Sequence, residues 1–222
     1  MSTRSLRGLC EQAELMRGAA GSVPSSIRPV LGAVLAGGES RRFGRDKTRV
    51  AVDGVPMAVR AAETLARVCD EVVVVSSRPV PDFGGRVVPD LRPGQGPLAG
   101  IESALRHGMD RGAASVFVLA SDLPRVDSDI VEVVIEGATG TGPDGEEVMA
   151  AAAHRVGNPD FEPLCAVYRI SCLDTVTHLL DNGEQAARAL VEAVEGRRVV
   201  LNAAAAWAVS LNVNLPEDLD RL

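Results

Sequence analysis

The segment from Leu35 to Lys47, Leu-Ala-Gly-Gly-Glu-Ser-Arg-Arg-Phe-Gly-Arg-Asp-Lys, carries the densest set of groups that can bind phosphate. The glycine pair Gly37–Gly38 lets backbone N–H groups approach an anion with no side chain in between. Arg41, Arg42 and Lys47 add three cations to the same loop. Lys47 is the single lysine among 23 basic residues, which indicates a position that needs an ammonium group rather than a planar guanidinium. The loop therefore predicts a polyphosphate site.

Two common phosphate-binding motifs do not fit this loop. A P-loop has its lysine directly after the second glycine, whereas Arg45 and Asp46 separate Gly44 from Lys47. The dinucleotide motif G-x-G-x-x-G also fails, because Gly37 and Gly38 are contiguous. The site must belong to another class of nucleotide-binding protein.

The elements that position this loop follow from the pattern of apolar residues. We expect strands at residues 30–36, 71–77, 86–89, 115–120, 148–153, 164–168, 199–201 and 209–213. We expect helices at residues 55–68, 97–107, 128–136, 172–180 and 185–194, and a terminal helix opened by Pro216. Continuous apolar strands separated by helices are typical of a parallel sheet that is covered on both faces. The sequence thus predicts a three-layer α/β fold with a mostly parallel sheet.

The chain divides into a tail and one domain. Residues 1–28 hold a short helical pattern near residues 9–16 and then a stretch rich in Gly, Ser and Pro, so we expect a flexible N-terminal tail. Residues 29–222 have the length of a single domain with a sizeable core.

Composition excludes several classes of protein. The formal net charge of −7 disfavours binding to nucleic acid, and no run of apolar residues approaches the roughly 20 that span a membrane. The cysteines form no C-x-x-C pair and the histidines no H-E-x-x-H motif, so we expect buried thiols in a reduced, cytoplasmic protein and no structural zinc. These residues are Cys10, Cys69, Cys165, Cys172, His107, His154 and His178.

Two aspartates follow predicted strands. Asp122 comes just after strand 115–120, where a carboxylate suits Mg²⁺ bound to phosphate. The alternative role, capping the next helix, suits Asp127 or Ser128 better. Asp90 follows the short strand 86–89 and is either a ligand-contacting residue or a turn residue.

Taken as a whole, the loop resembles the signature loop of the molybdenum cofactor guanylyltransferases, which have a Rossmann-like nucleotidyltransferase fold. The resemblance covers about residues 30–222 and continues in further motifs. They are Gly96-Pro97-Leu98-Ala99-Gly100, Asp122-Leu123-Pro124, Pro163-Leu164 with Ala166-Val167-Tyr168-Arg169, and Asn212-Val213-Asn214-Leu215-Pro216-Glu217-Asp218-Leu219. The resemblance implies transfer of GMP from GTP-Mg to the terminal phosphate of molybdenum-molybdopterin, with release of pyrophosphate. It also implies contact with molybdoenzyme maturation proteins.

Combined with phosphoryl-transfer chemistry, the resemblance assigns roles to individual residues. The expected catalytic residues are Lys47, Arg41 and Asp122, and the expected ligands of the cofactor Mg²⁺ are Asp122 and Asn214. The expected nucleotide-binding residues are Leu35, Ala36, Gly37, Gly38, Arg42, Lys47, Asp90, Gly96 and Asp122. For Arg41 and Arg42 the alternative is solvated loop charge, and for Asn214 it is a backbone hydrogen bond at a strand-to-helix corner.

Other functions stay open at this point. One is a related nucleotidyltransferase, such as a cytidylyltransferase for the same cofactor, a phospholactate guanylyltransferase or a sugar-phosphate nucleotidyltransferase. The glycine pair favours the guanylyl type, since cytidylyl relatives tend to carry Ala-Ala-Gly there. Another is a non-catalytic nucleotide-binding module. The stretch after Gly183 lacks the arginine or serine often found there in relatives, and Arg188 comes later, so the acceptor is less well defined than the nucleotide.

Overall fold

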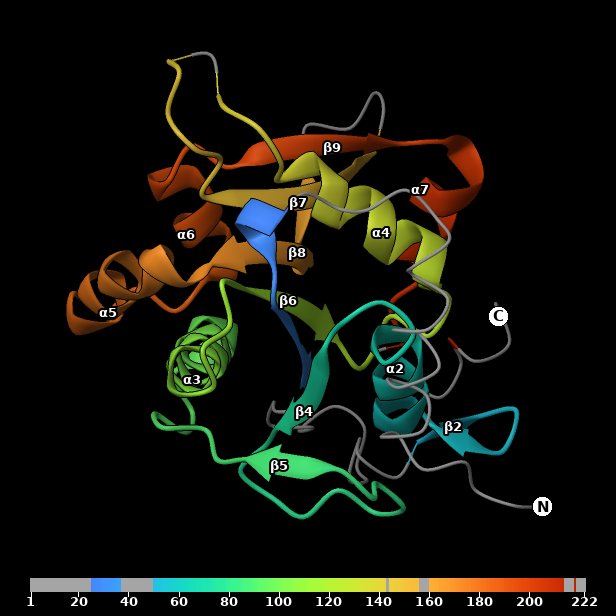
Figure 1. Ribbon diagram of the computed structural model, residues 1–222. Helices are drawn as coiled ribbons and strands as arrows, with labels where there is room; N and C mark the ends of the chain where they lie inside the picture. Colours follow the sequence, from blue (N-terminus) through green and yellow to red (C-terminus); the bar gives the residue numbers. More distant parts are fainter. Residues whose placement is uncertain (1–24, 37–49, 143, 156–159, 214–217, 219–222) are drawn as a thin grey trace.

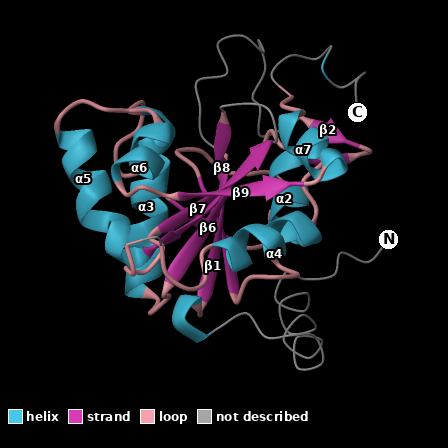
Figure 2. Ribbon diagram, turned by 90° about the horizontal axis from the view of Figure 1, so that it is seen from above, coloured by secondary structure: helices cyan, strands magenta, loops and turns pink. Residues whose placement is uncertain are grey.

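A seven-stranded sheet with helices on both faces forms the body of the molecule in the computed structural model (Figures 1 and 2). The structure describes residues 25–36, 50–142, 144–155, 160–213 and 218. The strands are β1 (Val30–Leu35), β2 (Ala51–Val52), β3 (Val55–Pro56), β4 (Glu71–Val75), β5 (Arg86–Val88), β6 (Ser115–Ala120), β7 (Ala150–Arg155), β8 (Phe161–Arg169) and β9 (Arg197–Leu201). The helices are η1 (Ser25–Ile27), α2 (Met57–Leu65), α3 (Gly96–Asp110), α4 (Ser128–Gly137), η3 (Ile170–Cys172), α5 (Leu173–Asp181), α6 (Ala187–Ala193) and α7 (Ala203–Ser210).

The strand order in the large sheet is β5-β4-β1-β6-β8-β7-β9. The strand β8 runs antiparallel to its neighbours β6 and β7, and the other pairs in this sheet are parallel. The three-layer, mostly parallel α/β fold is therefore confirmed. Within the described residues, no helix combines the length and apolar character needed to cross a bilayer.

Alternation along the strands divides the core between the two faces. In β1, Val30 and Val34 point to one cluster and Leu31 and Leu35 to the other, as the two-residue period of a strand requires. The first cluster takes in side chains of α2, α4 and α7, and the second takes in those of α3, α5 and α6. Figure 1 shows these two sets of helices on opposite sides of the sheet.

The expected strand at residues 209–213 is wrong. Residues Ala203–Ser210 form helix α7, and the Asn202 side chain caps it by accepting a hydrogen bond from the Ala205 N–H at 3.0 Å. A cap followed by four alanines favours a helix more strongly than the short apolar run after it favours a strand. The terminal helix expected at Pro216 lies outside the described residues.

The expected helix at 55–68 begins later than predicted. Val55 and Pro56 instead pair with Ala51 and Val52 in a small antiparallel hairpin. Its turn is made by Asp53 and Gly54, which both have positive φ angles, 53° and 78°. An Asp-Gly pair is a strong hairpin signal, and because the hairpin takes up Val55 and Pro56, helix α2 begins at Met57.

Residues 25–28 pack against the folded domain. Ile27 is fully buried, and its carbonyl accepts a hydrogen bond from the Ser115 hydroxyl at 2.7 Å. The Arg169 guanidinium donates to the Ser26 carbonyl at 2.7 Å, and Arg28 pairs with Asp70 at 3.0 Å. The helix expected near residues 9–16 lies outside the described residues.

Candidate functional site

The order of the strands reverses between β1 and β6, which makes this the switch point of the sheet. The chain runs outward from β1 to β4 and β5, and then crosses back to β6 on the other side of β1. In open α/β sheets, ligands bind at such a switch point, beyond the carboxyl ends of the strands. Leu35 and Ala120 are paired at the ends of β1 and β6, and the Ser121 N–H donates to the Leu35 carbonyl at 3.2 Å. The root of the glycine-rich loop and the start of the Asp122 segment therefore meet at this edge.

Asp122 is half-buried at the carboxyl end of β6. Next to it, Leu123 is buried in the core and anchors the turn. Asp127 caps helix α4 by accepting a hydrogen bond from the Ile130 N–H at 3.0 Å, so Asp122 is not the cap. The carbonyl of Asp122 accepts from the Val213 N–H at 2.9 Å, which brings the C-terminal segment to the same edge. Asp122 thus lies where a metal ligand is expected.

Asp90 lies beyond the carboxyl end of β5, the strand at the edge of the sheet. One of its carboxylate oxygens accepts a hydrogen bond from the Arg92 N–H at 3.0 Å. This contact is the turn role that the sequence allows for an aspartate there. The role of Asp90 in nucleotide binding stays a prediction.

Gly96 begins helix α3 in a crowded place. Its φ is +72°, and a Cβ added there would lie 2.8 Å from the Gln185 carbonyl oxygen. The N–H of Leu98 donates to that same carbonyl at 3.2 Å. Gly100, one turn further on, lies under the Leu35 side chain, with 3.2 Å between an added Cβ and the nearest methyl carbon. Gly100 is therefore a packing glycine, while Gly96 brings the start of α3 against the segment around Gln185.

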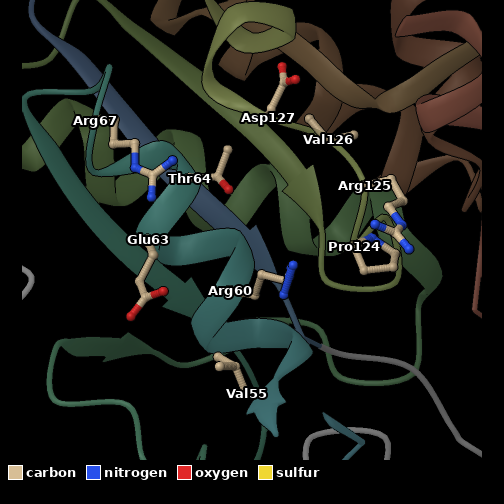
Figure 3. A pocket seen from close by; sticks show the side chains of 9 residues that line it. All are labelled: Val55, Arg60, Glu63, Thr64, Arg67, Pro124, Arg125, Val126 and Asp127. Atoms are coloured by element: carbon tan, nitrogen blue, oxygen red, sulfur yellow. The ribbon is translucent and has the colours of Figure 1, made fainter. Parts of the chain in front are cut away.

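Two hollows border this edge. The larger, of about 320 Å³, lies between α2 and the residues that follow Asp122, and Figure 3 shows the Arg60 and Arg125 side chains on its two walls. It is lined by Val55, Arg60, Glu63, Thr64, Arg67, Pro124, Arg125, Val126 and Asp127. The smaller, of about 130 Å³, is lined by Ala153, Asp160, Phe161, Glu162, Val209, Ser210 and Asn212. Asn212 precedes Val213, so the smaller hollow adjoins the Asp122 contact.

Several residues predicted for the site lie outside the described residues. They are Gly37, Gly38, Arg41, Arg42, Lys47 and Asn214. Of the predicted residues that are described, the structure brings Leu35, Ala36 and Asp122 to the switch point, places Asp90 on the loop between β5 and α3, and places Gly96 at the first residue of α3.

Sequence reasoning missed the polar residues that support the site. Glu102 is 1% exposed in the middle of α3, and it pairs with Arg92 and Arg106 at 2.8 Å each. Its signal is visible in the sequence, since one acidic residue interrupts the apolar run from Leu98 to Leu105. The sequence carries no comparable signal for the arginines that line the larger hollow, Arg60, Arg67 and Arg125. They line one hollow only because α2 packs beside the segment that follows Asp122.

Comparisons with known proteins agree with this geometry. Residues 32–199 match the family model described as "MobA-like NTP transferase domain". A "Probable molybdenum cofactor guanylyltransferase" of Opitutus terrae is 36% identical over 201 residues, covering 86% of this chain and 93% of that protein. A "Molybdenum cofactor guanylyltransferase" of Desulfosudis oleivorans is 32% identical over 199 residues, with the same coverage. The crystal structure of molybdopterin-guanine dinucleotide biosynthesis protein A from Archaeoglobus fulgidus superposes with a TM-score of 0.66 at 25% identity, covering 86% of this chain and 95% of that one.

Proposed function

The chain belongs to the MobA-like NTP transferase family, and on that premise we propose that it transfers GMP from GTP to the terminal phosphate of molybdenum-molybdopterin. An oxygen of the acceptor phosphate forms a bond to the α-phosphorus of GTP. The bond between the α-phosphorus and the α–β bridging oxygen breaks, and pyrophosphate leaves. The observation that carries the proposal is the hydrogen bond from Ser121 to Leu35 at the switch point of the sheet, which brings the segments of Ala36 and Asp122 to one edge; the names of the relatives support it.

The chemistry asks the protein for positioning and for charge stabilisation. In this proposal the amides of Gly37 and Gly38 hold phosphate oxygens, and Lys47 neutralises charge on the α-phosphate. Arg41 and Arg42 hold the leaving pyrophosphate. Asp90, after β5, and Gly96, at the start of α3, contact the nucleotide.

The residues at the switch point between β1 and β6 fit a magnesium ion. Asp122 offers a hard oxygen ligand, and Mg²⁺ takes one or two carboxylates and completes its shell with phosphate and water. Asn214 is the second proposed ligand, and the hydrogen bond from Val213 to Asp122 supports its assignment. When bound, the ion supplies charge neutralisation at the phosphates.

The acceptor side of the proposed site is the smaller hollow beside Asn212. Arg188 borders it, since its guanidinium lies 3.0 Å from an Asp160 oxygen and 4.5 Å from the centre of the Phe161 ring. A guanidinium there suits the terminal phosphate of the pterin. We propose the cytoplasm as the location, since Cys69, Cys165 and Cys172 are free thiols, and transient contact with molybdoenzyme maturation proteins as the route of the product.

Nucleotide specificity tests the proposal. Thermal shift in the presence of Mg²⁺ should show stabilisation by GTP, and molybdenum-molybdopterin with GTP should release pyrophosphate. A Lys47→Ala variant should bind GTP yet release none. Stabilisation by CTP alone would contradict the guanylyl assignment, and wild-type protein that binds GTP but never releases pyrophosphate would be a binding module.

The role of Asp122 is tested by a matched pair of substitutions. Asp122→Asn should lower kcat about a hundredfold or more, because the proposed metal ligand loses its charge. Asp127→Asn makes the same change five residues on, and should leave kcat as it is, because asparagine caps a helix as well as aspartate does. Equal loss in both variants would show that the Asp122 effect is structural.

A further inference from the structure

A buried carboxylate lies in helix α3 behind the nucleotide side of the site. The Glu102 side chain is 1% exposed, and the residues beside it on the helix, Ile101 and Leu105, are fully buried. Ionised carboxylates are almost never buried unless they are paired. The catalytic chemistry proposed above makes no use of this group, so the burial of a charge at this position needs another explanation.

Two arginines and a hydroxyl satisfy Glu102. Arg92 Nε donates to one carboxylate oxygen at 2.8 Å, and Arg106 Nη2 donates to the other at 2.8 Å. The Thr177 hydroxyl on α5 lies 3.2 Å from the second oxygen. Burial by itself raises the pKa of Glu102, but the hydrogen bonds from Arg106 and Arg92 outweigh it and lower the pKa below its usual value. Glu102 is therefore ionised at neutral pH and binds both guanidinium groups strongly.

The two arginines differ in what they hold. Arg106 lies four residues along the same helix, so its contact with Glu102 joins α3 to itself. Its guanidinium also donates to the Thr177 hydroxyl on α5 at 3.2 Å, and neither contact reaches the loop before α3. Arg92 lies in the loop between β5 and α3, two residues after Asp90. At the position before Arg92, the Leu91 N–H donates to the Ser103 hydroxyl at 3.0 Å. Adjacent residues of α3, Glu102 and Ser103, thus hold adjacent residues of the loop.

The same arginine reaches across to α5, which lies beside α3 in Figures 1 and 2. Arg92 Nη1 donates to an Asp181 oxygen at 2.7 Å, at the last residue of α5. Four residues further on, the Gln185 carbonyl accepts the Leu98 N–H and touches the Cα side of Gly96. Arg92 therefore joins the loop at residues 90–96 to the turn at residues 181–185, and the hydrogen bond from Leu98 to Gln185 joins the start of α3 to the same turn.

We propose that Arg92 and Glu102 are positioning residues that hold the nucleotide-side loop, residues 90–96, against the turn at residues 181–185. The inference rests on the proposed function, in which the loop contacts the nucleotide and the segment after this turn borders the acceptor hollow. Transfer between two bound substrates depends on their relative placement, and a displacement near 1 Å can cost about a hundredfold in rate. A guanidinium that spans two carboxylates fixes such a distance, which an ammonium group cannot do.

Arg92→Ala and Arg106→Ala are the matched pair that tests the proposal. Both remove one guanidinium from Glu102, but only the first releases the loop. Calorimetric titration of the full chain with GTP and Mg²⁺ should show binding weakened about tenfold by Arg92→Ala and less than about twofold by Arg106→Ala. The melting temperature of each variant shows how much stability it loses. Equal Kd values for GTP in the two variants would overturn the proposal.

Two further variants separate positioning from general stability. Arg92→Lys keeps one ion pair and loses the span, so its Kd for GTP should lie between those of wild type and Arg92→Ala. Asp181→Asn weakens only the contact with α5, and it should raise the KM of the acceptor more than the Kd of GTP. Suppose that Arg92→Lys has the same melting temperature as Arg92→Ala but binds GTP with the Kd of wild type. That result would contradict the role of Arg92.

The readouts also distinguish this proposal from the proposed function. GTP binding is measured without an acceptor. If Arg92→Ala weakens GTP binding but wild type releases no pyrophosphate with molybdenum-molybdopterin, the positioning of the loop is supported and the acceptor assignment fails. If wild type turns over normally and Arg92→Ala matches Arg106→Ala in Kd and KM, the positioning proposal fails and the proposed function stands.

Discussion

Gly96 is the position at which a single added methyl group should disturb the fold most directly beside the site. Its φ of +72° lies in the left-handed region, and a Cβ would lie 2.8 Å from the Gln185 carbonyl oxygen and 3.0 Å from the Gln185 Cβ. The nearest of these atoms belongs to the backbone, so the Gly96→Ala variant must move the turn or the start of α3. The change should therefore alter stability and GTP binding together.

The expected magnitude has two parts. A non-glycine residue in the left-handed region costs about 1–2 kcal/mol. Displacing Gln185 also loses the hydrogen bond that its carbonyl accepts from the Leu98 N–H, worth about 0.5–1.5 kcal/mol. The sum is about 1.5–3.5 kcal/mol, which corresponds to a fall in Tm of about 3–14 °C for a domain of this size.

Gly94 supplies the control, two residues away in the same loop. Its φ is +86°, but an added Cβ would have no atom within 4 Å. Gly94→Ala should therefore show the conformational cost alone, about 1–2 kcal/mol, and leave the Gln185 contact intact. Urea unfolding gives the free energies, and titration with GTP gives the Kd values. Equal losses of stability in the two variants would refute the steric argument.

Two further predictions use the buried ionisable groups. The pKa of Glu102 is lower in the folded protein than its ordinary value of 4.5, so the unfolded chain takes up the proton first as the pH falls. The stability that the charge contributes is complete above pH 4.5 and is lost as the pH falls through the lower folded pKa. Glu102→Gln should remove this dependence from the free energy of unfolding, measured in urea at several pH values. The same pH dependence in wild type and Glu102→Gln would contradict the prediction. Burial raises the pKa of Cys172 to about 12 and raises that of Cys165 further, and Cys69 is also buried. A thiol reagent should therefore label the native protein at most once, at Cys10, and mass spectrometry that finds two or more adducts before unfolding would be incompatible with these burials.

Local sequence predicts the layers of this fold well for a physical reason. A strand that is buried on both faces is apolar along most of its length, and the continuous apolar runs within residues 30–36, 71–77 and 115–120 show this without reference to any distant residue. The structure contains these strands as β1, β4 and β6 within one or two residues. The failures occur where two local signals compete, as at residues 209–213, where a capped alanine helix ends in a short apolar run.

The supporting contacts are different, because they join residues that are far apart in the chain. Arg92 and Asp181 are separated by 89 residues, and only the packing of α5 beside α3 makes them a pair. A sequence shows that Glu102 interrupts an apolar face, but it does not show which cations will neutralise the charge. That choice depends on the crossing of the helices.

By itself, the sequence predicted the chemistry: a glycine pair, a single lysine and an aspartate after a buried strand are patterns that can be read locally, before the fold is known. It also determined the alternation of strands and helices, since hydrophobic periodicity is local too. Only the tertiary structure decided that β6 lies beside β1, so that Ser121 bonds to Leu35 and Asp122 lies at the root of the loop. Strand order arises from packing the whole sheet, and no segment of the chain carries that information alone.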